Sequence, residues 1–216
     1  MNKFFDHKSM YSGLHQLDFK FKQNDKILDI GGGNKPFPPS THIIDFNDSE
    51  AEKQRHHKPL EIGDRIFLEG DAAAVLEGYD DNYFDFCYSS HTFEHVHNLP
   101  QLVDMINKKC KRGFYALPAS DFEFFTTQPH FGHVNLCRLL GDTLHITKRN
   151  PDSVIKEFAK VYEKLHAIPQ FNYLWEIKYR FLWEARLYWE GEIKYKFYEN
   201  SHDLYPQLKY FEEEQV

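Results

Sequence analysis

The sequence is poor in cysteine and has no long apolar run, and both absences restrict where the protein can work. Its 216 residues contain only three cysteines, widely spaced and without a CxxC pair, which argues against a disulfide framework and favours a reduced compartment. Residues 1–6 lack the apolar core of a signal peptide, and no segment approaches the length of a membrane span. We therefore expect a cytoplasmic protein with no membrane span.

Positive charge is also scarce, because 26 lysines and arginines face 33 acidic residues and leave a net charge of −7. The chain has no long basic run, so we expect no nucleic acid partner. Aromatic residues, by contrast, make up 17% of the chain, with 20 Phe and 13 Tyr. This share predicts a folded chain with thick aromatic packing or an aromatic-lined pocket, and it argues against disorder.

The chain is organised around residues 26–33, an apolar strand that contains Asp29 and ends in three glycines. A glycine run after a buried strand lets the backbone turn sharply and approach a ligand. A second short apolar strand, 41–46, ends in another acid, Asp45. Strand, glycine turn, second strand and terminal acid are typical of the nucleotide-binding half of an open α/β sheet, in which the acid holds the ribose hydroxyls.

Further strands and helices alternate along the chain, which predicts an α/β fold with a Rossmann-like, doubly wound and mostly parallel sheet. The segment 34–40 is too proline-rich for a regular helix, so the crossover between the first two strands is expected to be short. The cluster Arg55-His-His-Lys58 is interpreted as a solvated face. The remaining predicted elements are strands over 65–69, 83–88 and 112–117 and helices after Asp71 and over 99–110.

The C-terminal part is an aromatic-rich extension with a strand at 143–147 and an amphipathic helix at 151–166. Period-two patterning over 183–198, interrupted by Gly191, predicts an antiparallel β-hairpin that completes the sheet edge. Trp175, Trp183 and Trp189 either stack on a sugar ring or pack in the core. The predicted units are an N-terminal cap at 1–22, a core at 23–147, the extension at 148–210 and an acidic tail at 211–216.

These residues carry a family resemblance over about 24–120. Leu28-Asp-Ile-Gly-Gly-Gly33 is similar to the first motif of class I S-adenosylmethionine-dependent methyltransferases, and Asp45 stands where their ribose-binding acid ends the second strand. Gly70-Asp-Ala72 resembles their adenine-contacting segment, and residues 84–96 resemble the fourth strand and its turn. The chain looks like a type 11 methyltransferase. Its proline-rich loop, together with residues 111–120, resembles enzymes of saccharide-modification clusters.

The resemblance implies that S-adenosylmethionine is the cofactor and S-adenosylhomocysteine the product. Two departures stand out, because Lys35 falls where the third glycine of the motif is usual and a proline-rich loop replaces the usual first helix. For each acid of the predicted site, the alternative role is that of a helix cap or turn residue. The residues predicted to bind the cofactor are Asp29, Gly31, Gly32, Gly33, Asp45, Phe46, Asp71, Ala72, Ser89 and His91.

Methyl transfer to a hydroxyl needs an aligned acceptor and a base. The candidates lie in the aromatic segment 118–133, where Asp121, His130 and especially His133 could serve; the alternative is a surface loop without a catalytic role. The predicted reaction is O-methylation of a small-molecule acceptor such as a sugar or glycan. A methyltransferase for another small molecule or a protein, and a cofactor-binding module without catalysis, remain alternatives, and a homodimer is left open.

Residues 91–95 also match the motif of a different class of enzyme, the zinc hydrolases. His91-Thr-Phe-Glu-His95 matches the inverted zinc motif of hydrolases, in which two histidines four residues apart on a helix bind the metal. That remote alternative requires a helix through 91–95 and a third ligand further along the chain. The preferred interpretation involves no metal: His91 lies near the cofactor, and Glu94 and His95 start or support the next helix.

Overall fold

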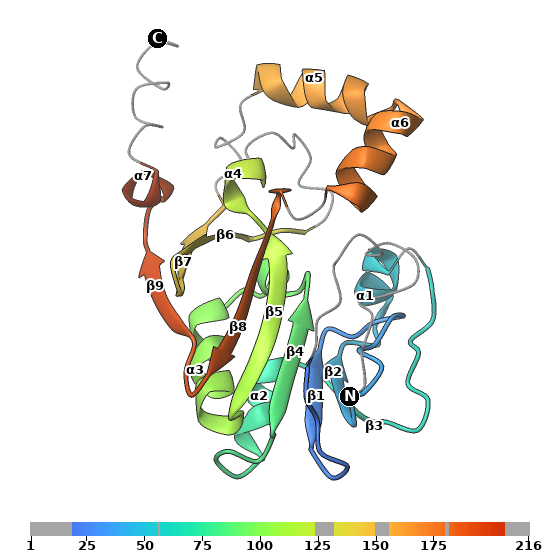
Figure 1. Cartoon of the computed structure of the whole chain (residues 1–216), viewed down its shortest axis with the longest axis vertical. Coiled ribbons are helices and arrows are strands. Elements are labelled where there is room, and N and C mark those ends of the chain that lie inside the picture. Colours follow the sequence, from blue (N-terminus) through green and yellow to red (C-terminus); the bar gives the residue numbers. More distant parts are fainter. Residues whose placement is uncertain (1–18, 56, 124–131, 150–155, 180–181, 206–216) are drawn as a thin grey trace.

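The computed structural model describes residues 19–55, 57–123, 132–149, 156–179 and 182–205, which form a central sheet, a second small sheet and short helices (Figure 1). The central sheet has the strand order β3-β2-β1-β4-β5-β8, and all neighbours pair in parallel except β5 and β8. This confirms the predicted mostly parallel α/β sheet. Its strands are β1 (Ile27–Ile30), β2 (His42–Asp45), β3 (Ile66–Glu69), β4 (Phe86–Ser90), β5 (Arg112–Pro118) and β8 (Glu184–Glu190).

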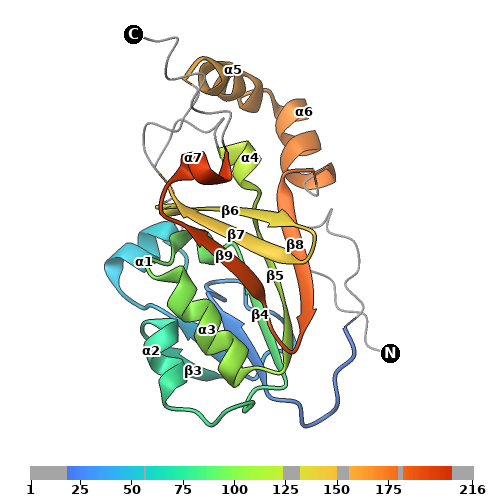
Figure 2. The ribbon, with the colours of Figure 1, turned by 90° about the vertical axis from the view of Figure 1, so that its left-hand side faces the viewer.

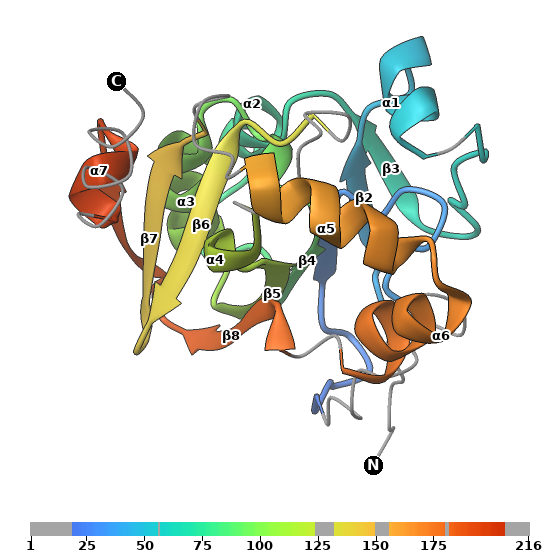
Figure 3. The same ribbon diagram turned by 90° about the horizontal axis from the view of Figure 1, so that it is seen from above.

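The helices are short. Helix α3 forms because its apolar residues recur at helical spacing and are buried on one face. Leu99, Leu102, Val103 and Ile106 recur at helical spacing and are fully buried on one face of α3. Helices α4, α5 and α6 lie beyond the carboxyl ends of the parallel strands (Figures 1 and 3). The helices are α1 (Ser49–Gln54), α2 (Ala72–Glu77), α3 (Leu99–Lys109), α4 (Ser120–Glu123), α5 (Lys156–His166), α6 (Pro169–Asn172) and α7 (Ser201–Leu204), with a π-helical turn η4 (Tyr173–Lys178) after α6.

The two faces of the central sheet are covered in different ways. Helices α2 and α3 pack on one face, and aromatic side chains cover the other. Phe37, from the proline-rich loop, stacks on Tyr88 with ring centroids 4.2 Å apart, and Phe19 packs against Phe86 and Phe114. As predicted, the loop between β1 and β2 contains no helix. Phe37 of this loop and the other aromatic side chains cover the face of the sheet that a helix would otherwise cover.

The predicted hairpin over 183–198 is wrong, although both of its strands exist. β8 joins the edge of the central sheet beside β5, whereas β9 (Lys194–Tyr198) runs parallel to β7 (Thr143–Lys148). β7 also pairs with β6 (Asn135–Leu140), and these three strands form a second sheet that lies next to α3 (Figure 2). The period-two pattern was correct for each strand, but the pairing partners come from distant parts of the chain.

Asn107 on α3 holds the chain where it leaves one sheet for the other. Its side-chain amide donates to the Ile193 carbonyl oxygen at 3.1 Å, and its carbonyl oxygen accepts the Ile193 N–H at 2.6 Å. Ile193 itself is buried in the main core. These two bonds pin the turn to α3 and direct β9 away from β8.

Replacing Asn107 by alanine should therefore lower the free energy of unfolding by about 1–3 kcal/mol, because both partly buried backbone groups of Ile193 lose their partner. Urea unfolding followed by circular dichroism measures the change. Asn98→Ala is the matched control, since the exposed Asn98 side chain donates to the Gln101 side chain and to no backbone group among the described residues. Equal midpoints for the two variants would contradict this role of Asn107.

None of the helices within the described ranges is long and apolar enough to cross a membrane. Cys87, Cys110 and Cys137 are free, buried thiols, which agrees with the absence of a disulfide framework. The cytoplasmic compartment remains a prediction. The predicted N-terminal cap up to residue 18, the start of the predicted helix at 151–155 and the predicted acidic tail at 211–216 lie outside the described residues.

Candidate functional site

The glycine turn and Asp45 meet at the carboxyl ends of β1 and β2. Gly31 and Gly33 adopt left-handed backbone angles, with φ of 76° and 57°. The Asp45 carboxylate accepts the N–H groups of Gly33 and Phe46, each at 2.7 Å. Burial raises the pKa of Asp45, although these two hydrogen bonds and the nearby Arg55 act in the opposite direction. A partly buried acid thus lies against the turn of the first motif.

Arg55 belongs to this edge of the sheet, which corrects the solvated-face prediction for this residue, whereas His57 and Lys58 are exposed as predicted. Its guanidinium nitrogen Nη1 donates to the Phe46 carbonyl oxygen at 2.9 Å and lies 3.9 Å from Asp45 Oδ1. Arg55 therefore helps to position Asp45 and its loop.

Asp29 lies beneath the glycine turn and is only 1% exposed. Its Oδ2 accepts the Phe37 N–H at 2.6 Å, and a Cβ atom on Gly32 would lie 2.6 Å from the same oxygen. The carboxylate therefore ties the proline-rich loop to β1, and Gly32 provides the space for it. This geometry favours a supporting role for Asp29 over the predicted contact with the cofactor, which remains a prediction.

The end of β4 is joined to the end of β1. Ser89 Oγ and Thr92 Oγ1 each donate to the Ile30 carbonyl oxygen at 3.2 Å. Thr92 packs so closely that a Cβ atom on Gly31 would lie 2.1 Å from its Oγ1. Ser89 and the glycine turn are thus brought together as predicted, and Thr92 is a contact that the motif did not reveal.

Three more predicted cofactor residues follow the neighbouring strands: Phe46 comes directly after β2, and Asp71 and Ala72 come after β3. Asp71 is exposed and caps α2, where its Oδ1 accepts the Ala74 N–H at 3.0 Å, and Ala72 is the first residue of that helix. Phe46, directly after Asp45, is 46% exposed. The cap role noted as the alternative for Asp71 is therefore real, and adenine contacts by Asp71, Ala72 and Phe46 remain predictions.

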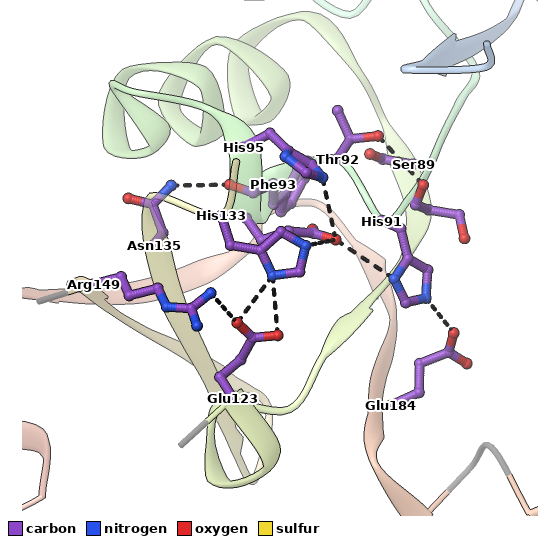
Figure 4. A network of polar contacts seen from close by, with 12 residues as sticks. Ser89, His91, Thr92, Phe93, His95, Glu123, His133, Asn135, Arg149 and Glu184 are labelled. Carbon is purple, nitrogen blue, oxygen red and sulfur yellow. Dashed lines mark hydrogen bonds and ion pairs between the residues drawn. The ribbon is translucent and has the colours of Figure 1, made fainter. Parts of the chain in front are cut away.

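His91 follows β4 with a left-handed φ of 53° and is held between two acids (Figure 4). Its Nε2 lies 2.6 Å from Glu184 Oε1, and the other oxygen of Glu184 accepts from Arg186 Nε at 2.5 Å. Its Nδ1 lies 3.5 Å from Glu94 Oε1. Glu184, the first residue of β8, therefore orients His91 from 93 positions away in the sequence.

Three partly buried histidines, His91, His95 and His133, lie close together (Figure 4), and each has a ring nitrogen within 4.0 Å of Glu94 Oε1. Glu94 is 2% exposed, and its Oε1 lies 3.9 Å from His95 Nε2 and 4.0 Å from His133 Nε2. Burial alone raises the pKa of Glu94, but the imidazoles of His91, His95 and His133 outweigh burial and lower the pKa to about 2. Burial is also the main reason that the pKa of His95 is lowered. At neutral pH the group thus contains a carboxylate beside a neutral His95.

His133 is fixed from its other side by Glu123. Its Nδ1 lies 3.0 and 2.9 Å from the two carboxylate oxygens of Glu123, and Arg149 Nη1 donates to Glu123 Oε2 at 2.9 Å. A proton on Nδ1 leaves the Nε2 lone pair directed toward Glu94. His133, our preferred candidate for a base, is therefore part of the polar group around Glu94.

The other two predicted bases are not tested by the structure. His130 lies outside the described residues, and of Asp121 only the backbone, within α4, is described. The helix that the zinc hydrolase motif needs is absent from the described segment 91–95: His91 has a left-handed backbone, and only the 3₁₀ turn η1 (Phe93–His95) follows. Glu94 and His95 also do not start the next helix, since α3 begins at Leu99.

Sequence patterns missed several residues of the site because their contacts join segments that are distant in the chain, even where the residue itself, such as Thr92, lies inside a motif. A detectable signal existed for Glu184 alone, since it is an acid within the aromatic run 181–189. The missed residues are Arg55, Thr92, Glu123, Arg149, Glu184 and Arg186.

The comparisons with known proteins point to the same part of the chain. Residues 28–117, which span β1 to β5, match the family model described as Methyltransferase domain. No curated protein matches the sequence. The domain match agrees with the predicted methyltransferase resemblance over this segment, and it does not specify the methyl acceptor.

Solved structures give more distant likenesses. A SAM-dependent methyltransferase from Archaeoglobus fulgidus has 20% identity and a TM-score of 0.38, covering 66% of this chain and 61% of its own. One from Methanosarcina mazei has 19% identity and a TM-score of 0.35, covering 48% and 57%. The YcgJ protein of Bacillus subtilis has 18% identity and a TM-score of 0.32, covering 44% of each chain. The chain thus spans between 44% and 61% of these relatives, too little to bear on its reaction.

Proposed function

We propose that this chain transfers the methyl group of S-adenosylmethionine to a hydroxyl of a saccharide or another small polar acceptor. The observation that carries the proposal is the meeting of the glycine turn, the partly buried Asp45 and the end of β4 at one edge of a parallel sheet. Ligands of open α/β sheets bind at the carboxyl ends of the strands. The acceptor class rests on the resemblance of the proline-rich loop and on the polar group around His91.

The residues at this edge suit the cofactor. Each carboxylate oxygen of Asp45 accepts one backbone N–H, and an ionised carboxylate has about four acceptor positions, so two remain for the ribose hydroxyls. The left-handed turn at Gly31 and Gly33 lets the backbone approach the amino acid end of the cofactor. Ser89 and His91, at the end of β4, would lie beside the sulfonium, which supplies the methyl group.

His91 is the group best held to take a proton from the acceptor. Glu184 orients its ring from Nε2, as a carboxylate does for a histidine that acts as a base. His133 is held instead by Glu123, which Arg149 holds in turn, and its Nε2 lies 4.0 Å from Glu94 Oε1 (Figure 4). We therefore assign proton transfer to His91 and give His133 a different role below.

The proposal is tested by calorimetric titration of S-adenosylhomocysteine into the purified protein, followed by an acceptor screen with labelled cofactor, nucleotide sugars and glycans. We expect micromolar binding and transfer to a saccharide. His91→Asn should keep the binding and lose about 10²- to 10⁴-fold in rate, whereas the exposed His97→Asn should change neither.

Each outcome of this screen separates the alternatives. Failure of the folded protein to bind S-adenosylhomocysteine would exclude methyl transfer. Transfer only to other small molecules or to proteins would exclude the saccharide. Binding without transfer to any acceptor would favour a cofactor-binding module without catalysis.

A further inference from the structure

Two segments that are distant in the sequence are bound tightly together around Glu94. The Val134 N–H donates to the Glu94 carbonyl oxygen at 2.7 Å. The Asn135 side-chain amide donates to the carbonyl oxygens of Phe93 and Val96, at 3.0 and 2.6 Å. The turn η1 and the start of β6 therefore hold Glu94, His95 and His133 in one place, and the arrangement depends on the fold rather than on flexible side chains.

The three side chains present one ligand atom each, and these atoms all lie within 4.8 Å of one another. The His95 and His133 rings meet edge to face, with centroids 4.7 Å apart. Zinc bonds of about 2.0–2.1 Å in a tetrahedral site place ligand atoms about 3.3 Å apart. The measured separations of 3.9 and 4.0 Å from Glu94 Oε1 to the two imidazole nitrogens need only small side-chain movements to reach that value.

His91 and His133 lie farther from Glu94 than from their other carboxylate partners. His91 meets Glu184 at 2.6 Å and His133 meets Glu123 at 2.9 Å, which are ordinary charge-assisted hydrogen bonds. Both buried carboxylate oxygens of Glu94, and Nδ1 of His95, have no hydrogen-bond partner among the described residues. Buried polar groups are normally paired, so a buried carboxylate whose three imidazole neighbours lie 3.5 to 4.0 Å away favours a shared cation.

The surroundings match those of a metal site. Metal-binding histidines usually donate their second ring N–H to a carboxylate, which fixes the tautomer and the direction of the ligand nitrogen. Glu123 does this for His133, and Arg149 holds Glu123. Oriented in this way, His133 turns Nε2 toward Glu94.

We infer that Glu94, His95 and His133 bind one divalent transition-metal ion. Two imidazoles and one carboxylate suit zinc and similar ions better than magnesium or calcium, which prefer oxygen ligands. Three protein ligands leave a coordination position for water or for an oxygen of the acceptor, and this last role alone rests on the proposed function. The site departs from the metal-free interpretation of the sequence, and it uses His133 where the hydrolase motif would use His91.

The test is calorimetric titration of Zn²⁺ into the full chain after treatment with a chelator. We expect one tight equivalent per chain, absent in Glu94→Gln, His95→Ala and His133→Ala. His97→Ala is the matched control, because His97 is exposed, lies two residues from His95 and is outside the cluster, so this variant should bind as the native chain does. Co²⁺ should give the visible absorption of a nitrogen- and oxygen-liganded ion, and Glu94→Gln should abolish it.

Glu123→Gln provides a readout that a merely structural role would not produce. If Glu123 positions His133, its replacement should weaken Zn²⁺ binding by about 10- to 100-fold while S-adenosylhomocysteine binding stays unchanged. The isosteric Glu94→Gln keeps the shape of the core, and its binding of S-adenosylhomocysteine reports whether it is folded.

The inference is wrong if the native chain takes up no Zn²⁺, or if the cluster variants bind it as well as the native chain does. The second result would place the ion on others among the 13 histidines. Zn²⁺ binding and S-adenosylhomocysteine binding are measured separately. If the native chain binds S-adenosylhomocysteine but no Zn²⁺, the metal site is overturned. If it binds Zn²⁺ but no S-adenosylhomocysteine, the proposed methyl transfer is overturned.

Discussion

Asp45→Asn should abolish measurable binding of S-adenosylhomocysteine while the protein stays folded. In the proposed complex the Asp45 carboxylate accepts both ribose hydroxyls, and hydrogen bonds to a charged group contribute about 1.5–3 kcal/mol each. Losing most of two such bonds weakens binding by at least about 100-fold, since about 1.4 kcal/mol corresponds to tenfold. Asparagine has a single acceptor oxygen, so it cannot also serve both backbone N–H groups that Asp45 now accepts.

The measurement is calorimetric titration of native and variant protein, with thermal unfolding to confirm the fold. Asp48→Asn is the matched control: Asp48 lies three residues away and accepts two backbone N–H groups, as the cap of α1. Asparagine caps helices as well as aspartate does, so this control should bind normally. Native affinity in Asp45→Asn would show that the ribose is held elsewhere.

Gly31→Ala should be the most destabilising single substitution at the glycine turn, lowering the free energy of unfolding by about 2–5 kcal/mol. Two physical effects combine at this residue. A side chain is strained at a φ of 76°, and its Cβ would lie 2.1 Å from Thr92 Oγ1 and 2.7 Å from Thr92 Cγ2. Because Thr92 is itself bonded to the Ile30 carbonyl oxygen, it cannot move aside without breaking the contact between β1 and β4.

Chemical denaturation of two further variants separates these effects. Gly191 has a φ of 80°, and no atom lies within 4 Å of the position that a Cβ would take there, so Gly191→Ala reports backbone strain alone. The double variant Gly31→Ala/Thr92→Ala removes the two closest atoms and should recover part of the loss. If Gly31→Ala lowers the free energy of unfolding no more than Gly191→Ala does, the close packing of Thr92 on the turn does not contribute to stability.

Most of the central sheet could be predicted because its signals are local. β1, β2, β3 and β5 are short apolar runs bounded by turn residues, and each lies within a residue or two of its predicted position. β4 begins at Phe86, three residues later than predicted. The prolines of 34–40 excluded a helix on steric grounds alone. Pairing between strands is not local, and this is why β8 and β9, alike in pattern, could not be assigned to different sheets.

The candidate site divides in the same way. The glycines and Asp45 follow one another within one strand–turn–strand unit, so their meeting was predictable. His91 meets Glu184 across 93 positions, Glu94 meets His133 across another long stretch, and nothing in the spacing of the chain encodes these contacts. The zinc motif failed for a related reason, because the motif assumes a helix where the turn after β4 produces a left-handed residue.

By itself the sequence determined the α/β class, the glycine turn with its acid, and the likeness to methyltransferases that the domain match confirms. Tertiary structure alone decided which strand closes the sheet, which acid orients His91 and which histidine joins Glu94. The physical reason is the range of the forces involved. Backbone preference and apolar periodicity act over a few neighbouring residues, whereas a buried carboxylate finds its partners only after the chain has folded around it.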